Sequence, residues 1–150
     1  MRRLKGFTLI ELLVVIAIIS VLATLLMTNF VGVRQRGRDG VRKSDLRQIQ
    51  ASLEQYRFDN SSYPDTVPCG SELSSGIGTV YMQEIPCDPL TNVSYEYEAL
   101  PAGCSGTLCT TYTLLACLEN PNDLEKDDDD GGIDDKCTTT GFVSFTVATP

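Results

Sequence analysis

The sequence contains no histidine and no tryptophan among its 150 residues. Without histidine, the serine–histidine–aspartate and cysteine–histidine arrangements used in nucleophilic catalysis are impossible. The only lysines or arginines after residue 57 are Lys126 and Lys136, and no CxxC pair suggests a redox or zinc site. We therefore expect that the protein is not an enzyme.

Basic residues are scarce in the second part of the chain. Residues 1–57 carry ten lysines and arginines and four acidic residues, whereas residues 58–150 carry two and sixteen, giving a net charge of -8. Such an acidic region is unsuited to binding nucleic acid, which is not an expected partner. For the basic residues 34–43 we expect contact with lipid headgroups, the sharper alternative being DNA binding.

Proline is absent before Pro64. One long helix over about residues 7–58 is therefore predicted, and at 1.5 Å per residue it would be roughly 75 Å long. Gly32, Gly37 and Gly40 weaken this helix, because each glycine costs about 1 kcal/mol relative to alanine in a helix interior. A bend or a locally melted turn is expected there.

The first part of this predicted helix, residues 7–31, is almost entirely apolar. About 20 such residues span a bilayer, so the segment predicts a transmembrane helix. It contains one carboxylate, Glu11, and ionisable groups inside membranes are costly and by default functional. The alternative is that Glu11 snorkels to the interface or sits at the helix N-terminus, where the helix dipole favours an anion.

The second part of the predicted helix is amphipathic over residues 41–58. Leu46, Ile49, Leu53 and Tyr56 recur at helical spacing, so this stripe should pack on a sheet. After an irregular segment, residues 59–92, three strands are predicted.

The predicted strands cover residues 95–98, 110–118 and 142–148. In the first of them aromatic and acidic residues alternate, which indicates one buried and one solvated face. An antiparallel meander of three or four short strands laid on the helix is the economical arrangement. The fold class predicted from the residues is therefore α+β.

All the cysteines follow the apolar segment. An even number confined to this part of the chain suggests disulfides formed in an oxidising compartment. Six cysteines allow fifteen sets of pairings, and sequence alone cannot choose among them. As hypotheses, local spacing favours three pairs: Cys69–Cys87, Cys104–Cys109 and Cys117–Cys137.

A short basic lead ends in the run Gly6-Phe7-Thr8-Leu9-Ile10-Glu11. This run resembles the prepilin processing site of type IV pilins and of the pseudopilins of type II secretion. Further along, Ile85-Pro86, Asp88-Pro89 and the strand after residue 94 are similar to the major-pseudopilin pattern. The sequence departs from that pattern at Leu90-Thr91, where the family usually has Trp-Gly.

The resemblance implies a pilin-like α+β fold, with a long N-terminal helix on a small antiparallel sheet and an acidic C-terminal loop. It implies that a prepilin peptidase removes residues 1–6 by cutting after Gly6 and methylates the new N-terminus at Phe7. Residues 7–31 would form the transmembrane and filament-core helix, and residues 32–150 the soluble domain. Glu11 would pair with the Phe7 amine of a neighbouring subunit during assembly.

The resemblance also implies partners and a location. The chain would be a single-pass protein of the cytoplasmic membrane with an extracytoplasmic C-terminal domain. It would form a homo-oligomeric helical filament, on the cell surface or in the periplasm, with minor pilins or pseudopilins, an assembly platform and an ATPase. Pilus and pseudopilus remain open. The alternative is a membrane-tethered, calcium-dependent binding module that does not polymerise.

An acidic, glycine-containing run covers residues 125–136. Calcium takes six to eight oxygen ligands, and glycines let a loop fold carboxylates around the ion. Major pseudopilins hold calcium in such a loop just before their last strand, so the resemblance implies a calcium site here; the alternative is a solvated acidic turn. The expected ligands are Asp128, Asp130, Asp134 and Asp135.

Overall fold

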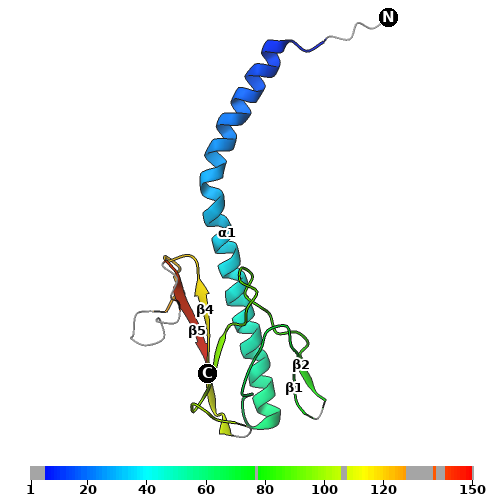
Figure 1. Cartoon of the computed structure of the whole chain (residues 1–150), viewed down its shortest axis with the longest axis vertical. Coiled ribbons are helices and arrows are strands. Elements are labelled where there is room, and N and C mark those ends of the chain that lie inside the picture. Colours follow the sequence, from blue (N-terminus) through cyan, green and yellow to red (C-terminus); the bar gives the residue numbers. More distant parts are fainter. Residues whose placement is uncertain (1–5, 77, 106–107, 128–136, 138–140, 150) are drawn as a thin grey trace, which may run out of the picture. The chain divides into compact units, whose positions relative to one another are not determined.

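A computed structural model describes residues 6–76, 78–105, 108–127, 137 and 141–149. The chain divides into two compact units, Met1–Arg34 and Gln35–Pro150. The elements are α1 (Leu9–Asn60), β1 (Leu73–Ser74), β2 (Val80–Met82), β3 (Glu96–Leu100), β4 (Thr111–Leu118) and β5 (Val143–Ala148) (Figure 1). The predicted α+β class is confirmed.

Helix α1 is continuous over 52 residues. The helix passes without interruption through the three glycines of residues 32–40, so the locally melted turn predicted there is wrong. The physical reason lies in the neighbouring side chains. Arg38, Asp39 and Arg42 are all fixed by ion pairs, and these tertiary contacts offset the low helix propensity of glycine.

The end of α1 has a left-handed cap. Ser61 has a φ of 60°, and its N–H donates a hydrogen bond of 2.7 Å to the carbonyl of Arg57. A residue in this conformation just after a helix turns the chain away and satisfies a terminal carbonyl. Pro64 follows and cannot continue the helix.

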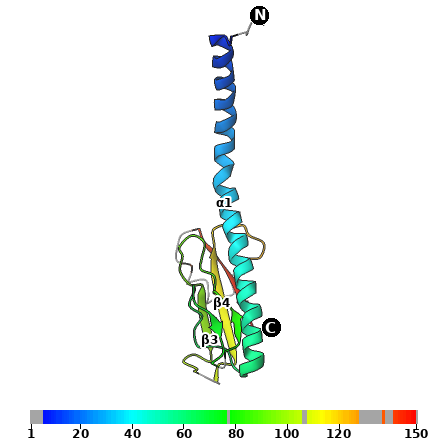
Figure 2. The ribbon, with the colours of Figure 1, turned by 90° about the vertical axis from the view of Figure 1, so that its right-hand side faces the viewer.

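Two antiparallel sheets follow the helix. The larger has the order β3-β4-β5, with Glu96 opposite Leu115 and Cys117 opposite Ser144. The smaller is the β1–β2 pair, which lies inside the segment predicted to be irregular. Its strands of two and three residues are too short to show a periodic pattern. Within the second unit, α1 runs alongside β3 and β4 (Figure 2).

The core of the second unit lies between α1 and β4. Leu46, Ile49 and Leu53 are at most 1% exposed and join Leu114 and Leu118 in one buried cluster. The predicted amphipathic stripe is therefore confirmed, because its apolar side faces the sheet. The alternation predicted for β3 is also seen, since its glutamates are exposed and the tyrosine between them is half-buried.

Three disulfides fasten the irregular segments. They join Cys69 to Cys87, Cys104 to Cys109 and Cys117 to Cys137, with Cα–Cα distances of 5.0, 5.2 and 5.6 Å. These are the same pairs that local spacing favours. Each bridge contributes roughly 2 to 4 kcal/mol, mainly by restricting the unfolded chain, which matters for a core of this size.

Candidate functional site

The segment that precedes α1 is extended and exposed. Residues 6–8 lie outside the helix, and the Phe7 side chain is 84% exposed. A Cβ placed on Gly6 would meet no atom within 4 Å. Proteases cut exposed, non-helical chain, so the Gly6–Phe7 peptide bond is open to a peptidase.

Thr8 and Glu11 form a reciprocal cap at the start of α1. The Thr8 N–H and hydroxyl donate to Oε2 of Glu11 at 2.9 and 2.7 Å, and the Glu11 N–H donates to the Thr8 hydroxyl at 3.3 Å. This is the capping box, in which two residues three apart satisfy the free donors of a helix N-terminus. The Thr-x-x-Glu spacing is visible in the sequence. The cap fixes the Glu11 carboxylate within the first turn.

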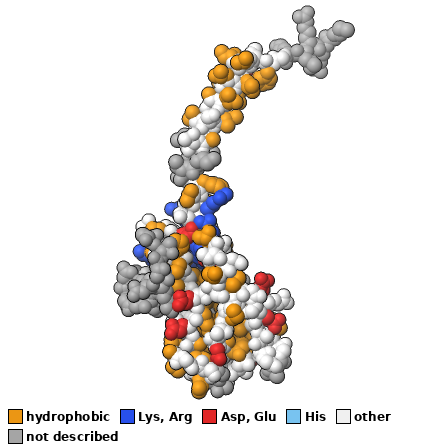
Figure 3. All heavy atoms as spheres, viewed as in Figure 1, with side chains coloured by type: hydrophobic (Ala, Val, Ile, Leu, Met, Phe, Trp, Pro, Cys, Tyr) orange, Lys and Arg blue, Asp and Glu red, His pale blue; other side chains and the backbone are white. Residues whose placement is uncertain are grey.

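The first unit exposes a nearly continuous apolar surface. Large apolar side chains from Phe7 to Leu22 are between 46% and 84% exposed (Figure 3). The hydroxyls of Ser20 and Thr24 donate to the carbonyls four residues earlier, at 2.7 and 2.9 Å. Both hydroxyl protons are therefore hydrogen-bonded within the helix and need no partner from outside the helix. Among the described residues, no helical stretch is both long enough and apolar enough to cross a membrane.

The second unit contains a buried charge cluster centred on Arg42. The Arg42 side chain is 1% exposed and contacts three carboxylates. It donates to Asp39 and Glu119 at 2.8 Å each and to Asp88 at 2.6 Å. Arg38 adds two hydrogen bonds to Glu119, at 2.5 and 2.6 Å. We call these five residues the Arg42 cluster.

The Arg42 cluster joins three distant parts of the second unit. Arg38, Asp39 and Arg42 come from α1, Asp88 from the loop before β3, and Glu119 from the residue after β4. The two Asp39 oxygens also accept the backbone N–H groups of Glu119 and of Asn120 at 2.9 Å each. Asp39 therefore binds the chain where it leaves the sheet.

The prediction that basic residues 34–43 contact lipid headgroups is wrong for three of them. Arg38 and Arg42 belong to the Arg42 cluster, and Lys43 donates to Asp123 at 2.9 Å and to Glu125 at 2.8 Å. Sequence reasoning missed these pairs because, apart from Asp39, the partners lie 46 to 82 positions away. One signal was available in the sequence: residues 1–57 have an excess of basic residues and residues 58–150 an excess of acidic ones, which favours ion pairs between the two parts. Arg34 remains exposed, over the ring of Phe30.

Comparison with known proteins places these features in a family. The family model described as "Prokaryotic N-terminal methylation motif" matches residues 1–27. The type II secretion system core protein G of Vibrio cholerae is 30% identical to the chain, over 77% of the chain and 83% of that protein. The chain belongs to the core protein G family. The resemblance stated from the sequence is thereby confirmed, and the relatives are structural subunits, not enzymes.

Two further relatives, a second core protein G and a pilus component, extend this comparison. The Escherichia coli K12 protein is 32% identical over 71% of the chain and 86% of its own length. The type IV wide pilus major component PilA4 of Thermus thermophilus is 49% identical, over 42% of the chain and 48% of that protein. No solved structure matches the chain. The chain is thus similar both to secretion proteins and to a pilus protein.

The predicted calcium ligands of this core protein G family member, Asp128, Asp130, Asp134 and Asp135, lie outside the described residues. The structure does describe the flanks of that run. Asp127 accepts hydrogen bonds from the N–H and hydroxyl of Thr146 at 3.1 and 2.7 Å, and Cys137 is bonded to Cys117. Among the described residues, no group of three or more acidic or cysteine side chains is placed to hold a metal ion.

The Arg42 cluster makes the stability of the second unit depend on pH. Hydrogen bonds from Arg42 and from two backbone N–H groups outweigh burial and lower the pKa of Asp88 from 3.8 to about 2. Hydrogen bonds from Arg38 and Arg42 likewise lower the pKa of Glu119. Because the folded protein binds fewer protons than the unfolded chain, this stability is present above about pH 4 and is lost as the pH falls towards 2.

We expect an Asp88→Asn variant to isolate this effect. Asparagine keeps an oxygen that can accept the N–H groups of Leu90 and Thr91 but carries no charge. The variant should be less stable than the parent by about 2 kcal/mol at pH 7, and the difference should vanish near pH 2. Urea unfolding at several pH values measures it. Burial raises the pKa of Asp45, and the Asp88 charge adds to that rise, so only the part due to burial cancels in the comparison. A difference independent of pH would contradict the assignment.

Proposed function

We propose that this chain is a structural subunit of a type II secretion pseudopilus or type IV pilus. The observation that carries the proposal is the match of residues 1–27 to the methylation motif. In the structure the described part of this motif is an exposed segment followed by a capped helix with an apolar surface. The subunit would be cleaved after Gly6, methylated at Phe7 and held in the cytoplasmic membrane with its C-terminal domain outside. It would then enter a helical filament.

The apolar side chains of residues 7–31 supply the attraction for both stages. A single chain in water would expose large apolar surface, at a free-energy cost of about 25 cal/mol per Å². Lipid removes that cost before assembly, and packing of identical helices removes it afterwards. We propose that residues 7–31 are the membrane segment first and the filament core later.

Cleavage would create the positive charge that Glu11 needs. Removal of residues 1–6 turns the Phe7 amide into an amine, which is cationic at neutral pH. Glu11 is held in the first turn of α1, so an amine from a neighbouring subunit could pair with it inside the apolar core. The remaining partners, a prepilin peptidase, an assembly platform with its ATPase and minor subunits, follow from the family proposal.

The test is the intact mass and N-terminus of the protein in material sheared from cells that produce it. A chain starting at methylated Phe7 in the sheared fraction supports a surface pilus. The same processed chain confined to the cell envelope supports a pseudopilus. A chain that keeps residues 1–6 and never sediments as filament would overturn the proposal in favour of a membrane-tethered module.

We also propose that the acidic run binds calcium through Asp128, Asp130, Asp134 and Asp135. The support is chemical: carboxylates are the oxygen ligands that calcium prefers. The flanks of the run are fixed to the sheet by Asp127 and by the Cys117–Cys137 bridge, which lowers the entropy lost on binding. Calorimetry of the full chain in detergent should show binding that Asp130→Asn weakens at least tenfold. Absence of heat at millimolar calcium would reject the site.

A further inference from the structure

The sheet has a step at one edge of β4. Strand β3 begins at Glu96, opposite Leu115, whereas β4 continues to Leu118. The last three residues of β4 therefore pair only with β5, as far as the described strands go. The chain before β3 leaves the sheet at this point, and a pocket opens between it and β4.

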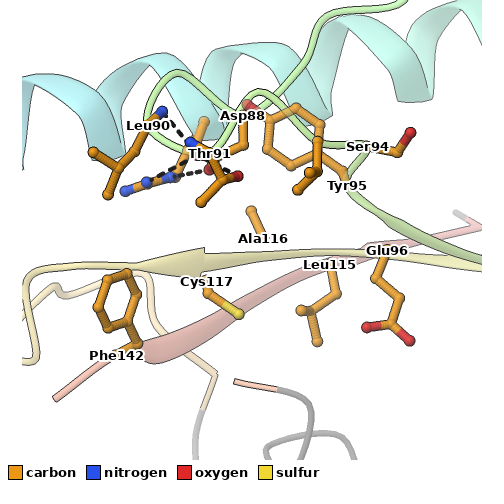
Figure 4. A pocket seen from close by; sticks show the side chains of 12 residues that line it. Asp88, Leu90, Thr91, Ser94, Tyr95, Glu96, Leu115, Ala116, Cys117 and Phe142 are labelled. Atoms are coloured by element: carbon orange, nitrogen blue, oxygen red, sulfur yellow. Dashed lines mark hydrogen bonds and ion pairs between the residues drawn. The ribbon is translucent and has the colours of Figure 1, made fainter. Parts of the chain in front are cut away.

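This pocket, which we call the edge pocket, has a volume of about 270 Å³. Residues 115–117 of β4 line one side, where Ala116 points toward Leu90 and Thr91 and the side chains of Leu115 and Cys117 point to the opposite face of the strand (Figure 4). The remaining lining residues include Arg42, Asp88, Val93, Tyr95 and Phe142. A cavity of about 150 Å³ with an apolar lining already accepts a benzene molecule, so the edge pocket has room for one aliphatic side chain.

The rim of the edge pocket is also apolar. Leu90 and Val93 are 52% and 57% exposed although they lie beside the opening. The lining is mixed, since Ser94 and Glu96 join Arg42 and Asp88 there. Single exposed apolar residues need no explanation, but two of them at the mouth of a partly apolar pocket favour a surface that a partner covers.

A matching protrusion exists on the same unit. Leu124 is 100% exposed, and both of its neighbours are fixed to α1. Lys43 donates to Asp123 at 2.9 Å, and Lys43 and Arg47 donate to Glu125 at 2.8 and 2.6 Å. The residues on either side of Leu124 are thus held, while its side chain points into solvent. Because this turn is already ordered, less conformational entropy is lost when a partner covers Leu124.

The protrusion and the pocket are both anchored to neighbouring residues of α1. Arg42 lines the edge pocket, and the next residue, Lys43, holds the Leu124 turn. Consecutive helical residues differ by 1.5 Å along the axis and by about 100° around it. The edge pocket and the Leu124 turn are therefore two different surfaces of the second unit.

We propose that Leu124 of one subunit fills the edge pocket of the laterally adjacent subunit in the filament. The proposal rests on the proposed function. A helical filament repeats one heterologous contact, in which two different surfaces of the same chain meet, and a self-complementary patch would instead close a dimer. A protrusion and a cavity on two different surfaces of one unit provide such a pair. Arg47, 59% exposed beside Leu124, would approach the acidic Glu96 at the pocket wall.

A photo-crosslink tests this contact in assembled filaments. The full chain carrying Leu124→p-benzoylphenylalanine is assembled in cells and irradiated, and the covalent dimers are digested for mass spectrometry. The expected crosslinks join residue 124 to the peptide that contains residues 88–96, or to residues 115–117, of another chain. Crosslinks confined to other regions, or filaments that give no dimer, would overturn the proposal.

A second pair of variants measures the effect on assembly. Leu124→Asp should reduce filament yield at least tenfold while leaving the thermal midpoint unchanged, because the side chain is fully exposed in its own subunit. The matched control is Leu108→Asp, which removes another exposed leucine, 65% exposed, outside the interface. Wild-type yield from Leu124→Asp would reject the contact. Failure of the unmodified chain to form any filament would reject the proposed function instead.

Discussion

Replacing Arg42 with methionine is expected to lower the free energy of unfolding by about 3 to 5 kcal/mol, the usual effect of removing one partner from a buried ion pair. Methionine fills a similar volume but leaves Asp39, Asp88 and Glu119 without their shared cation. Asp39 is itself only 1% exposed, so water cannot replace the lost contact. Urea unfolding of the full chain in mild detergent, followed through the near-ultraviolet signal of its tyrosines, measures the change.

The matched control is Arg36→Met, the same exchange on the exposed face of the same helix. It should change the free energy of unfolding by less than about 0.5 kcal/mol, as most surface substitutions do. Equal effects of the two variants would show that the Arg42 cluster contributes no more than a surface arginine. An intermediate value for Arg42→Lys would agree with lysine supplying the charge without the planar fork that contacts three carboxylates.

Glu11→Ala is expected to reduce filament yield more than tenfold while the chain still enters the membrane fraction. Alanine is more apolar than glutamate, so insertion is not impaired. Assembly would suffer because the Phe7 amine of the neighbouring subunit would be buried without a counter-charge. The measurement compares filament yield with membrane-bound protein in the same cells.

Two further variants separate the charge of Glu11 from its role in the helix cap. Glutamine also serves in a capping box, so Glu11→Gln keeps the contact with Thr8 but loses the charge. Thr8→Ala keeps the charge and removes the hydroxyl contacts of the cap, while the N–H of residue 8 can still donate to Glu11. If the charge sets assembly, Glu11→Gln fails as completely as Glu11→Ala, and Thr8→Ala assembles. Normal filaments from Glu11→Gln would refute the charge pairing.

The parts of the fold that follow from local pattern could be predicted. The absence of proline before Pro64 and the spacing of Leu46, Ile49 and Leu53 define α1 and its buried side. The β-branched and aromatic runs before residues 118 and 148 define β4 and β5. The processing site could be predicted because its residues are contiguous.

The Arg42 cluster could not be predicted, because the meaning of an arginine depends on residues far along the chain. Arg34, Arg36 and Arg42 look alike in the sequence, yet only Arg42 faces the sheet and meets Asp88 and Glu119. The edge pocket could not be predicted from the sequence either. It arises from a difference in length between β3 and β4, and the sequence pattern defines strand ends only to within a few residues.

The Arg42 cluster also has a mechanical consequence. A sliding of α1 along the sheet by four residues, about 6 Å, would move Arg42 to the place of Leu46, which is fully buried among apolar side chains. That shift would bury a cation without a counter-charge, which is strongly unfavourable. The helix therefore does not slide along the sheet while the second unit stays folded. Under tension along α1, the second unit should therefore keep its register until it unfolds as a whole.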